Sequence, residues 1–307
     1  MIWSPAFFLQ QDILTSKGTF LFDLLTQYLP APGSVSNYVI AAAMALLQAV
    51  MLNVMVSKYR LTEEITLFPG VFYLLLMGFN PAFWIVNPLL IANFFVLFAI
   101  IELVATYKEY SSAGRIYNVG FFIGLGSLCY FSYIVFLIFA WIGIGIVRAI
   151  QWRERVTLIL GFLSPYFLVG TYQYWNDNLS LFWEKGILGN FQFLSFGTFN
   201  GFGELVTAGL IAFFVVVGIF SYKLYTYKKK IKIQKIIDLL YWVLAISALS
   251  ILFQVQINVQ HFQILLPILA IFVSINFVEM SKRWSGLLHL FLFVGILIWH
   301  YIPLLNI

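Results

Sequence analysis

Charged residues are scarce in this chain, and their scarcity excludes an ordinary soluble domain. Of the 307 residues, 62% are hydrophobic and only 9% are charged, whereas soluble domains average about 25% charged residues. We therefore expect an all-α, polytopic transmembrane helix bundle. The formal net charge is +5, but no basic stripe interleaves with aromatic residues outside the loops, so we expect no nucleic-acid partner.

Residues that carry metal or hydrolytic chemistry are also few. The single Cys129 lies in an apolar stretch, which excludes a disulfide framework and a thiolate metal cage. The histidines His261, His289 and His300 are far apart and form no zinc-binding pair at helical spacing. The chain has no paired-aspartate protease motif and no exposed serine turn. These absences disfavour intramembrane hydrolysis, and the sequence indicates no metal site and no evident cofactor.

Acidic residues are nearly absent from the middle of the apolar segments. A carboxylate at the bilayer centre is costly and normally marks function, and a proton-coupled or ion-coupled transporter should have one. Asp238 and Glu204 are expected to open helices instead, where the helix dipole favours an anion. The chain also has no obvious inverted repeat, so transport is the weaker alternative.

The remaining acids in apolar segments have basic neighbours in the sequence. Glu102 is near the end of its predicted helix and is expected to reach toward Lys108. Glu279 is followed at helical spacing by Lys282 and Arg283, which predicts a local ion pair. Both acids are therefore interpreted as structural.

Basic residues, by contrast, are concentrated in short clusters between the apolar stretches. Only Lys17 and Lys185 lie outside these clusters, which are Lys58/Arg60, Lys108/Arg115, Arg148/Arg153/Arg155, the six lysines from Lys223 to Lys235, and Lys282/Arg283. Cationic loops are retained on the cytoplasmic side during insertion. We therefore predict a multi-pass protein of the bacterial inner membrane with all five clusters in the cytosol.

Apolar stretches of about 20 residues cross a bilayer as helices. The candidates are Asn37–Val56, Ile65–Phe79, Pro88–Thr106, Val156–Tyr172, Gly203–Tyr222, Ile237–Gln256, Phe262–Met280 and Ser285–Leu304. The stretch Ile116–Val147 is too long for one ordinary span, and a single helix there would separate the basic clusters on either side of it. We predict a hairpin of two short helices meeting near Tyr130, which gives about ten spans.

This topology divides the chain into an outward-facing tail, residues 1–36, and a transmembrane bundle, residues 37–307. The outward loops are Asn80–Asn87, residues 173–202 and Ile257–His261. Nothing in the tail explains its export, so we expect a further helix upstream of Met1. The amphipathic stretch Ile13–Leu29 predicts either a helix in the membrane interface or a connector packed on the bundle.

The long outward loop holds the densest group of candidate binding residues. Asp177, Glu184 and Lys185 stand there beside Trp175 and Trp183. Sugar faces stack on aromatic rings while their hydroxyls bond to acids, so the loop suits carbohydrate recognition. The same rings equally suit an interfacial aromatic belt.

Several short segments resemble the core of the GT-C membrane glycosyltransferases, which transfer sugars from polyprenyl-phosphate carriers. These segments are Asn80–Trp84, Asn87–Leu90, the glycine-rich run Gly120–Phe136, and His261–Pro267, whose Leu-Leu-Pro pattern is similar to a helix start in that family. The chain is also similar to a family of polytopic inner-membrane proteins of Bacteroidota. The resemblance implies a GT-C-like helix arrangement and membrane lipids as partners.

The chain departs from the GT-C pattern at two positions. Asn87 stands where an acid is often found, and Tyr130 stands where a basic residue is usual. The family's catalytic aspartate lies in the first outward loop, and Asp12 or Asp23 is the candidate in that region. This carboxylate would act as general base on an acceptor hydroxyl.

The resemblance also implies a cation that stabilises the departing lipid phosphate, and His261 or Lys185 is the candidate for it. The donor would be a polyprenyl-phosphate sugar. Three readings follow from the sequence: a GT-C-like scaffold or accessory subunit with envelope protein partners, a glycosyltransferase acting on the outer face, and a transporter.

Overall fold

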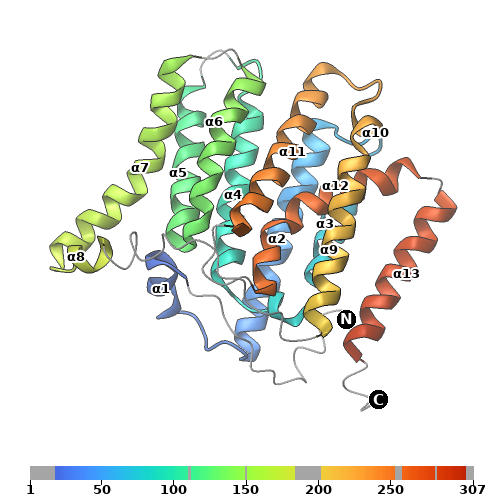
Figure 1. Cartoon of the computed structure of the whole chain (residues 1–307), viewed down its shortest axis with the longest axis horizontal. Coiled ribbons are helices and arrows are strands. Elements are labelled where there is room, and N and C mark those ends of the chain that lie inside the picture. Colours follow the sequence, from blue (N-terminus) through green and yellow to red (C-terminus); the bar gives the residue numbers. More distant parts are fainter. Residues whose placement is uncertain are drawn as a thin grey trace.

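The computed structural model describes residues 18–109, 112–148, 151–183, 202–252, 258–280 and 282–301. These residues fold into helices and short connectors, with no strand among them. Asp12, Glu184 and Lys185 lie outside the described residues. The all-α class predicted from composition is confirmed for the described part of the chain (Figure 1).

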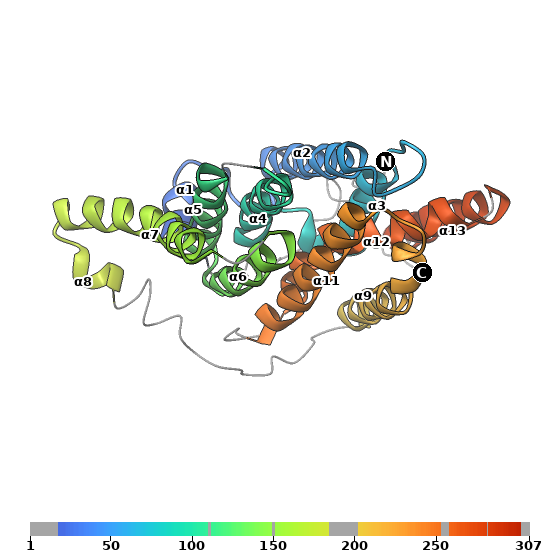
Figure 2. The same cartoon turned by 90° about the horizontal axis from the view of Figure 1, so that it is seen from above.

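The elements are, in chain order, α1 (Phe20–Thr26), α2 (Val35–Tyr59), α3 (Phe68–Met77), η2 (Pro81–Phe83), α4 (Pro88–Ala105), α5 (Ala113–Cys129), η3 (Phe131–Val135), α6 (Phe136–Val147), α7 (Trp152–Trp175), α8 (Leu179–Leu181), α9 (Phe202–Phe220), α10 (Tyr222–Thr226), α11 (Ile231–Leu252), η6 (Val259–Ile264), α12 (Leu266–Glu279) and α13 (Lys282–Tyr301). Seen from above, α7 and α8 lie at one flank of the molecule and α13 at the other (Figure 2).

Helices α2, α4, α7, α9 and α11 are long and apolar enough to cross a membrane. Helices α3 and α12 are shorter, at 10 and 14 residues. With a rise of about 1.5 Å per residue, they cover about half to two-thirds of a hydrocarbon core that is about 30 Å thick. The structure therefore fits a membrane protein, whereas the count of about ten spans stays a prediction.

The predicted hairpin is present in the structure. Helices α5 and α6 run antiparallel, with η3 at their turn (Figure 1). At the far end of α6, Arg148 donates hydrogen bonds to the carbonyls of Thr106 and Glu109, at 3.0 and 2.7 Å. Arg148 also pairs with Glu154 at 3.0 Å. The basic clusters before α5 and after α6 therefore lie at the same end of the bundle.

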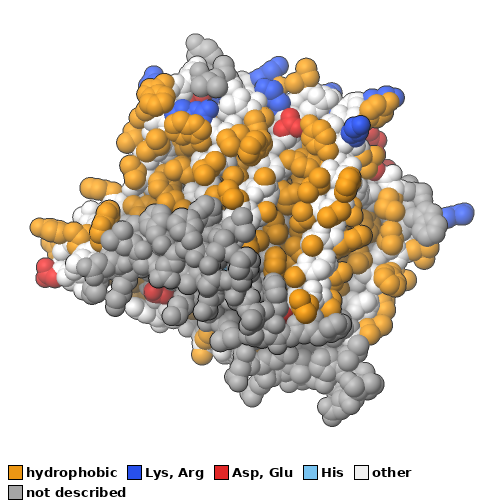
Figure 3. Space-filling view, in the orientation of Figure 1, with side chains coloured by type: hydrophobic (Ala, Val, Ile, Leu, Met, Phe, Trp, Pro, Cys, Tyr) orange, Lys and Arg blue, Asp and Glu red, His pale blue; other side chains and the backbone are white. Residues whose placement is uncertain are grey.

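Contacts between distant segments bring the other basic clusters to this end as well. Lys229 pairs with Glu63, which follows α2, and with Glu279 at the end of α12, at 3.1 and 3.4 Å. The Lys232 ammonium lies over the rings of Tyr59 and Tyr107. Most of the Lys and Arg side chains visible in Figure 3 lie toward the upper edge, and one projects from the right-hand side at about mid-height. We call this the cationic end.

Helices α5 and α7 pack backbone to backbone through glycines. A Cβ added to Gly120 would lie 2.1 Å from the carbonyl oxygen of Leu158, and one added to Gly161 would lie 2.2 Å from that of Tyr117. Gly124, one turn after Gly120, meets α7 in the same way. Small residues four apart allow this close approach of helices in membranes.

The short helices α3 and α12 pack together inside the bundle. Each is continued by irregular chain: the connector after α3 and η6 before α12. The connector from Asn80 to Asn87 is largely buried, and so is most of η6. Both segments are predicted as outward loops; the structure shows that their side chains pack against the rest of the protein, and the side that they face stays a prediction. Irregular backbone in a membrane protein is tolerated where protein surrounds it. Here side chains of these segments and of α2 and α4 form hydrogen bonds with the connector backbone.

Candidate functional site

Polar side chains, most of them buried and those of Tyr130 and Asn258 half-buried, gather where the α3–α4 connector meets η6, and we call them the buried polar cluster. Its members are Asn37, Asn80, Asn87, Asn93, Tyr130, Tyr133, Thr207, Asn258, His261 and Gln263. They come from α2, α4, η3, α9 and η6 together with the ends of neighbouring elements. Segments that lie far apart along the chain therefore meet at this cluster.

His261 and Tyr130 join η6 to the end of α5. The Tyr130 hydroxyl lies 2.6 Å from His261 Nε2, and the backbone N–H of Asn258 donates to His261 Nδ1 at 2.9 Å. Because Nδ1 accepts a hydrogen bond, the neutral ring carries its proton on Nε2 and donates it to the tyrosine oxygen.

The histidine ring is therefore held in its neutral form. His261 is 3% exposed and lies in η6, outside the five apolar helices. Burial disfavours the imidazolium and lowers the pKa of His261 from 6.5 to about 4. A neutral ring does not supply the cation that the GT-C resemblance implies for this position.

Side-chain amides connect α4 with η6. Asn87 Nδ2 donates to Gln263 Oε1 at 2.9 Å, and Asn93 Nδ2 donates to the Gln263 backbone carbonyl, also at 2.9 Å. The Tyr133 hydroxyl donates to Asn93 Oδ1 at 2.6 Å. Such a bond contributes about 1 kcal/mol net, and leaving a buried partner unsatisfied costs about 1–3 kcal/mol. These amides fix the two segments against each other.

Two more amides tie the α3–α4 connector to neighbouring helices. Asn37 Oδ1 accepts from the backbone N–H of Val86 at 2.9 Å. Asn80 Nδ2 donates to the Thr207 hydroxyl on α9 at 3.1 Å. Asn87 also caps α4, because its Oδ1 accepts from the N–H of Leu90 at 2.8 Å. The connector is thus held at both ends and along its length.

The chemistry of the buried polar cluster is uncharged. Amides, hydroxyls and a neutral imidazole can brace backbone or hydrogen-bond a neutral hydroxyl group. In the described ranges, no group of three or more His, Cys, Asp or Glu residues could hold a metal ion. The arrangement is suited to holding the connectors in place.

The amino-terminal segment reaches the bundle beside this cluster. The backbone N–H of Thr19 donates to the carbonyl of Cys129 at 3.0 Å, and the Thr19 hydroxyl donates to the carbonyl of Leu128. Thr19 is therefore joined to the residue before Tyr130. The next residues form α1, which carries Asp23. This residue is exposed by surface area, but neighbouring atoms partly desolvate its carboxyl, and this desolvation raises the pKa of Asp23.

The predicted amphipathic stretch is described from Gly18 onward. Within it, α1 packs against α5 through the buried Phe22, and the Phe20 ring meets Phe182 of the α8 region edge-on at 5.7 Å. This contact is the arrangement expected of a connector packed on the bundle.

The candidates of the long loop lie at the free end of α7. Trp175 is 85% exposed and Trp183 is 57% exposed. Asp177 has a positive φ of 56°. Its N–H donates to Tyr174 O at 3.2 Å, and the N–H of Asn178 donates to Gln173 O at 2.9 Å. This is a Schellman motif, so Asp177 occupies the left-handed position that ends the helix.

The predicted site residues therefore do not form one group in the described chain. Helix α8 lies at the flank of the molecule in both views, whereas α12, which follows His261, lies toward the other side (Figures 1 and 2). Asp23 lies on α1, one turn after Thr19, which bonds to the residue before Tyr130. Sequence reasoning missed Gln263 and Asn93 as partners; Asn and Gln inside apolar runs were the available signal.

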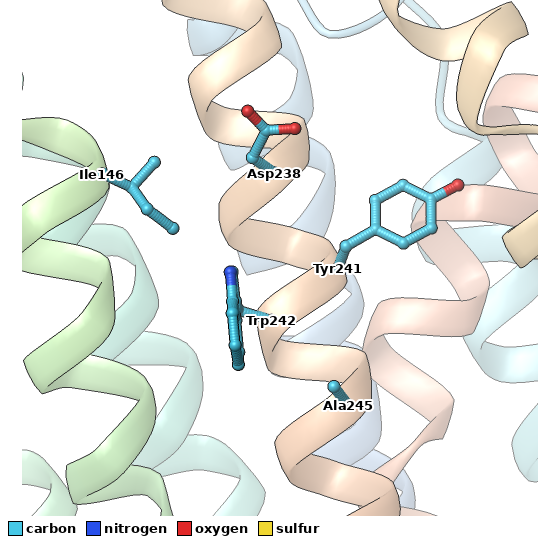
Figure 4. A pocket seen from close by; sticks show the side chains of 5 residues that line it. All are labelled: Ile146, Asp238, Tyr241, Trp242 and Ala245. Carbon is cyan, nitrogen blue, oxygen red and sulfur yellow. The ribbon is translucent and has the colours of Figure 1, made fainter.

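Asp238 lines a surface hollow of about 360 Å³ between α6 and α11. Figure 4 shows Asp238 and Trp242 on α11 facing Ile146 on α6. The Tyr222 hydroxyl donates to Asp238 Oδ1 at 2.8 Å. The prediction that Asp238 opens a helix is wrong, because α11 begins at Ile231 and Asp238 lies two turns inside it. Glu204, in contrast, is in the first turn of α9 as predicted.

Comparison with known proteins does not assign this chain to a family. No family model matches the chain, and no curated protein and no solved structure matches it.

Proposed function

We propose that the protein is a multi-pass scaffold or accessory subunit of the bacterial inner membrane. The observation that carries this proposal is the use of His261: both of its ring nitrogens are hydrogen-bonded within the fold, and the ring is buried and neutral. The position that the GT-C resemblance assigns to a catalytic cation thus serves to brace two connectors. The side-chain amides of Asn87 and Gln263 are likewise hydrogen-bonded to each other.

The proposed orientation places the cationic end in the cytosol. Fixed positive charge resists translocation, and the basic clusters share one end of the bundle. The opposite end then faces the envelope and carries the exposed rings of Trp175 and Trp183. Exposed aromatic side chains of this kind are typical of protein interfaces, so envelope proteins are the proposed partners.

A deletion strain and a purification together test the scaffold proposal. We expect normal cell-surface glycans in the deletion strain and co-purification of an envelope protein with the tagged chain in mild detergent. A Trp175→Ala/Trp183→Ala variant should lose that partner, whereas Trp152→Ala, which removes an exposed ring (74% exposed) at the cationic end, should keep it. Loss of a glycan in the deletion strain would contradict the proposal.

A glycosyltransferase is the second candidate, and the attachment of Thr19 beside Tyr130 favours it. This contact brings the amino-terminal segment, with Asp23 on α1, next to the buried polar cluster. In this alternative Asp23, or Asp12 upstream, is the general base and a polyprenyl-phosphate sugar is the donor. Asp12→Asn or Asp23→Asn should then remove a surface glycan at unchanged protein level, while Asp177→Asn should not.

A further inference from the structure

Positive charge at the cationic end is unevenly compensated. Lys229 pairs with Glu63 and Glu279, and Arg148 pairs with Glu154. The charges of these two cations are therefore balanced by neighbouring carboxylates. Lys230 and Lys232, which follow Lys229 at the start of α11, have no such carboxylate partner among the described residues.

A pocket of about 560 Å³ lies where the α4–α5 connector meets the start of α11. It is lined by Tyr107, Lys108, Lys230, Ile231 and Lys232. Among the described residues, none of its three lysines forms an ion pair. We call it the lysine pocket.

Three ammonium groups lie close to the ring of Tyr107, one from the α4–α5 connector and two from α11. The Nζ atoms of Lys108, Lys232 and Lys235 lie 5.8, 5.7 and 5.9 Å from its centroid. A ring face attracts a cation, but three ammonium groups around one ring repel one another. The carboxylate of Glu109 on the same connector is already paired with a guanidinium at 2.7 Å. The pocket therefore favours an anion from outside the chain.

Two features indicate what kind of anion fits. The pocket lies at the amino end of α11, a 22-residue helix whose dipole adds positive potential there. Apolar side chains are exposed beside the lysines: Ile231 is 70% exposed and Tyr227 is 68% exposed. A phosphate that carries acyl chains satisfies both the charge and the apolar surround.

We propose that the lysine pocket binds the phosphate ester of an acidic phospholipid headgroup from the leaflet at the cationic end. Lys108, Lys230 and Lys232 hold the phosphate, and Ile231 contacts the lipid beside it. The proposal requires a membrane protein but neither the scaffold nor the transferase function, so its failure would leave both of those untouched.

The test uses the full chain in nanodiscs of phosphatidylcholine with increasing phosphatidylglycerol. Bound phosphatidylglycerol is counted by native mass spectrometry, and thermal unfolding is followed in parallel. The pocket variant is Lys108→Gln/Lys230→Gln/Lys232→Gln. Its matched control is Arg153→Gln/Lys223→Gln/Lys228→Gln, which removes the same charge from the same end but leaves the pocket intact.

We expect the pocket variant to lose phosphatidylglycerol affinity by about 10-fold or more and the control by about 2-fold or less. Equal losses in both variants would overturn the proposal, because they would mean that binding is spread over the whole surface. Glycerol 3-phosphate, added to phosphatidylcholine nanodiscs, distinguishes a soluble source. Stabilisation by this compound without a response to phosphatidylglycerol would overturn the lipid assignment.

Both triple variants remain testable because the substituted side chains are exposed at the surface. Unchanged melting temperatures in pure phosphatidylcholine are expected for both. A variant that elutes as aggregate would be replaced by the single substitution Lys230→Gln, for which a loss of phosphatidylglycerol binding is still expected and unchanged binding would count against the proposal.

Discussion

At the scale of single residues, His261 shows how a hydrogen-bond pattern sets a charge. An imidazolium would place a second N–H against the backbone N–H of Asn258, which already donates to Nδ1. The fold therefore accepts only the neutral ring. A base whose pKa is lowered by folding contributes stability that is complete above its unfolded pKa of about 6.5 and is lost as the pH falls toward 4.

We predict that acidification destabilises the wild-type protein through this ring. Between pH 7 and pH 4 the loss attributable to His261 is on the order of 3 kcal/mol, because the unfolded chain binds a proton that the folded chain excludes. His261→Gln should be less stable at pH 7.5 but should lose less on acidification. Melting temperatures in detergent from pH 7.5 to pH 4.5 measure both effects.

Tyr130→Phe is the control for that experiment. It removes the hydroxyl that faces Nε2 but keeps the titrating ring, so it should lower stability at every pH and retain the full acid sensitivity. If His261→Gln and Tyr130→Phe gave the same pH profile, His261 would not be the titrating group.

The position of Asp177 at the left-handed end of α7 leads to a second prediction. A non-glycine residue at a left-handed helix end is strained, and glycine there is favoured. Asp177→Gly should therefore raise the free energy of unfolding by about 0.5–1 kcal/mol, and Asp177→Val should lower it. Thermal unfolding of the two variants measures this. A drop in stability for Asp177→Gly would mean that the carboxylate makes a contact that outweighs the strain.

The observed ion pairs show that closeness in the sequence does not decide which cation pairs with which carboxylate. Glu102 was predicted to reach Lys108, but it pairs with Arg115 at 3.1 Å. Lys108 has a positive φ of 58° at the turn after α4 and its ammonium lies over Tyr107. Glu279 pairs with Lys229, which lies between α10 and α11, and the side chain of Lys282, one of its two predicted partners, lies outside the described part of the chain. The observed partners of Glu102 and Glu279 thus come from other helices or connectors of the fold.

At the scale of elements, the α5–α7 contact depends on the absence of side chains. Gly120 on α5 and Gly161 on α7 each lie against the backbone of the other helix. Membrane helices gain little from apolar burial against each other, since lipid is equally apolar, so close van der Waals contact decides their association. A methyl group at either position would force the two backbones apart.

We predict that Gly120→Ala destabilises the protein by about 1–3 kcal/mol, as overpacking does elsewhere. Gly114→Ala on α5 and Gly170→Ala on α7 are matched controls, because no atom lies within 4 Å of a Cβ added at either position. Both controls should be neutral or slightly stabilising, since alanine is the better helix former. Chemical or thermal unfolding in detergent checks the order. Equal effects at Gly114 and Gly120 would refute the close contact.

The α5–α6 hairpin was predictable and the short helices were not. The length of the stretch Ile116–Val147 and the basic clusters at its ends allowed only the hairpin if both clusters share a side. The spans predicted at Ile65–Phe79 and Phe262–Met280, in contrast, became α3 and α12 with irregular neighbours. Apolar composition does not distinguish a helix from a connector that is buried by the rest of the protein.

At the scale of the whole molecule, the common end of the basic clusters leads to a prediction of sidedness. In a Cys129→Ala background, Asn176→Cys at the end of α7 should react with a membrane-impermeant maleimide in spheroplasts. Gln151→Cys, which lies exposed at the cationic end before α7, should react only after permeabilisation. Reaction of Asn176→Cys only from the cytosol would reverse the topology and remove the basis for envelope partners.

The helical class, the apolar segments and the distribution of positive charge can be read directly from the amino-acid sequence. These follow from composition and from spacing along the chain, and each residue contributes to them independently. The fold was needed to show which segments are buried connectors, that Asn87 meets Gln263, and that His261 is a neutral brace. The physical reason is that hydrogen bonds and desolvation depend on partners brought together from distant parts of the chain, and no local pattern encodes them.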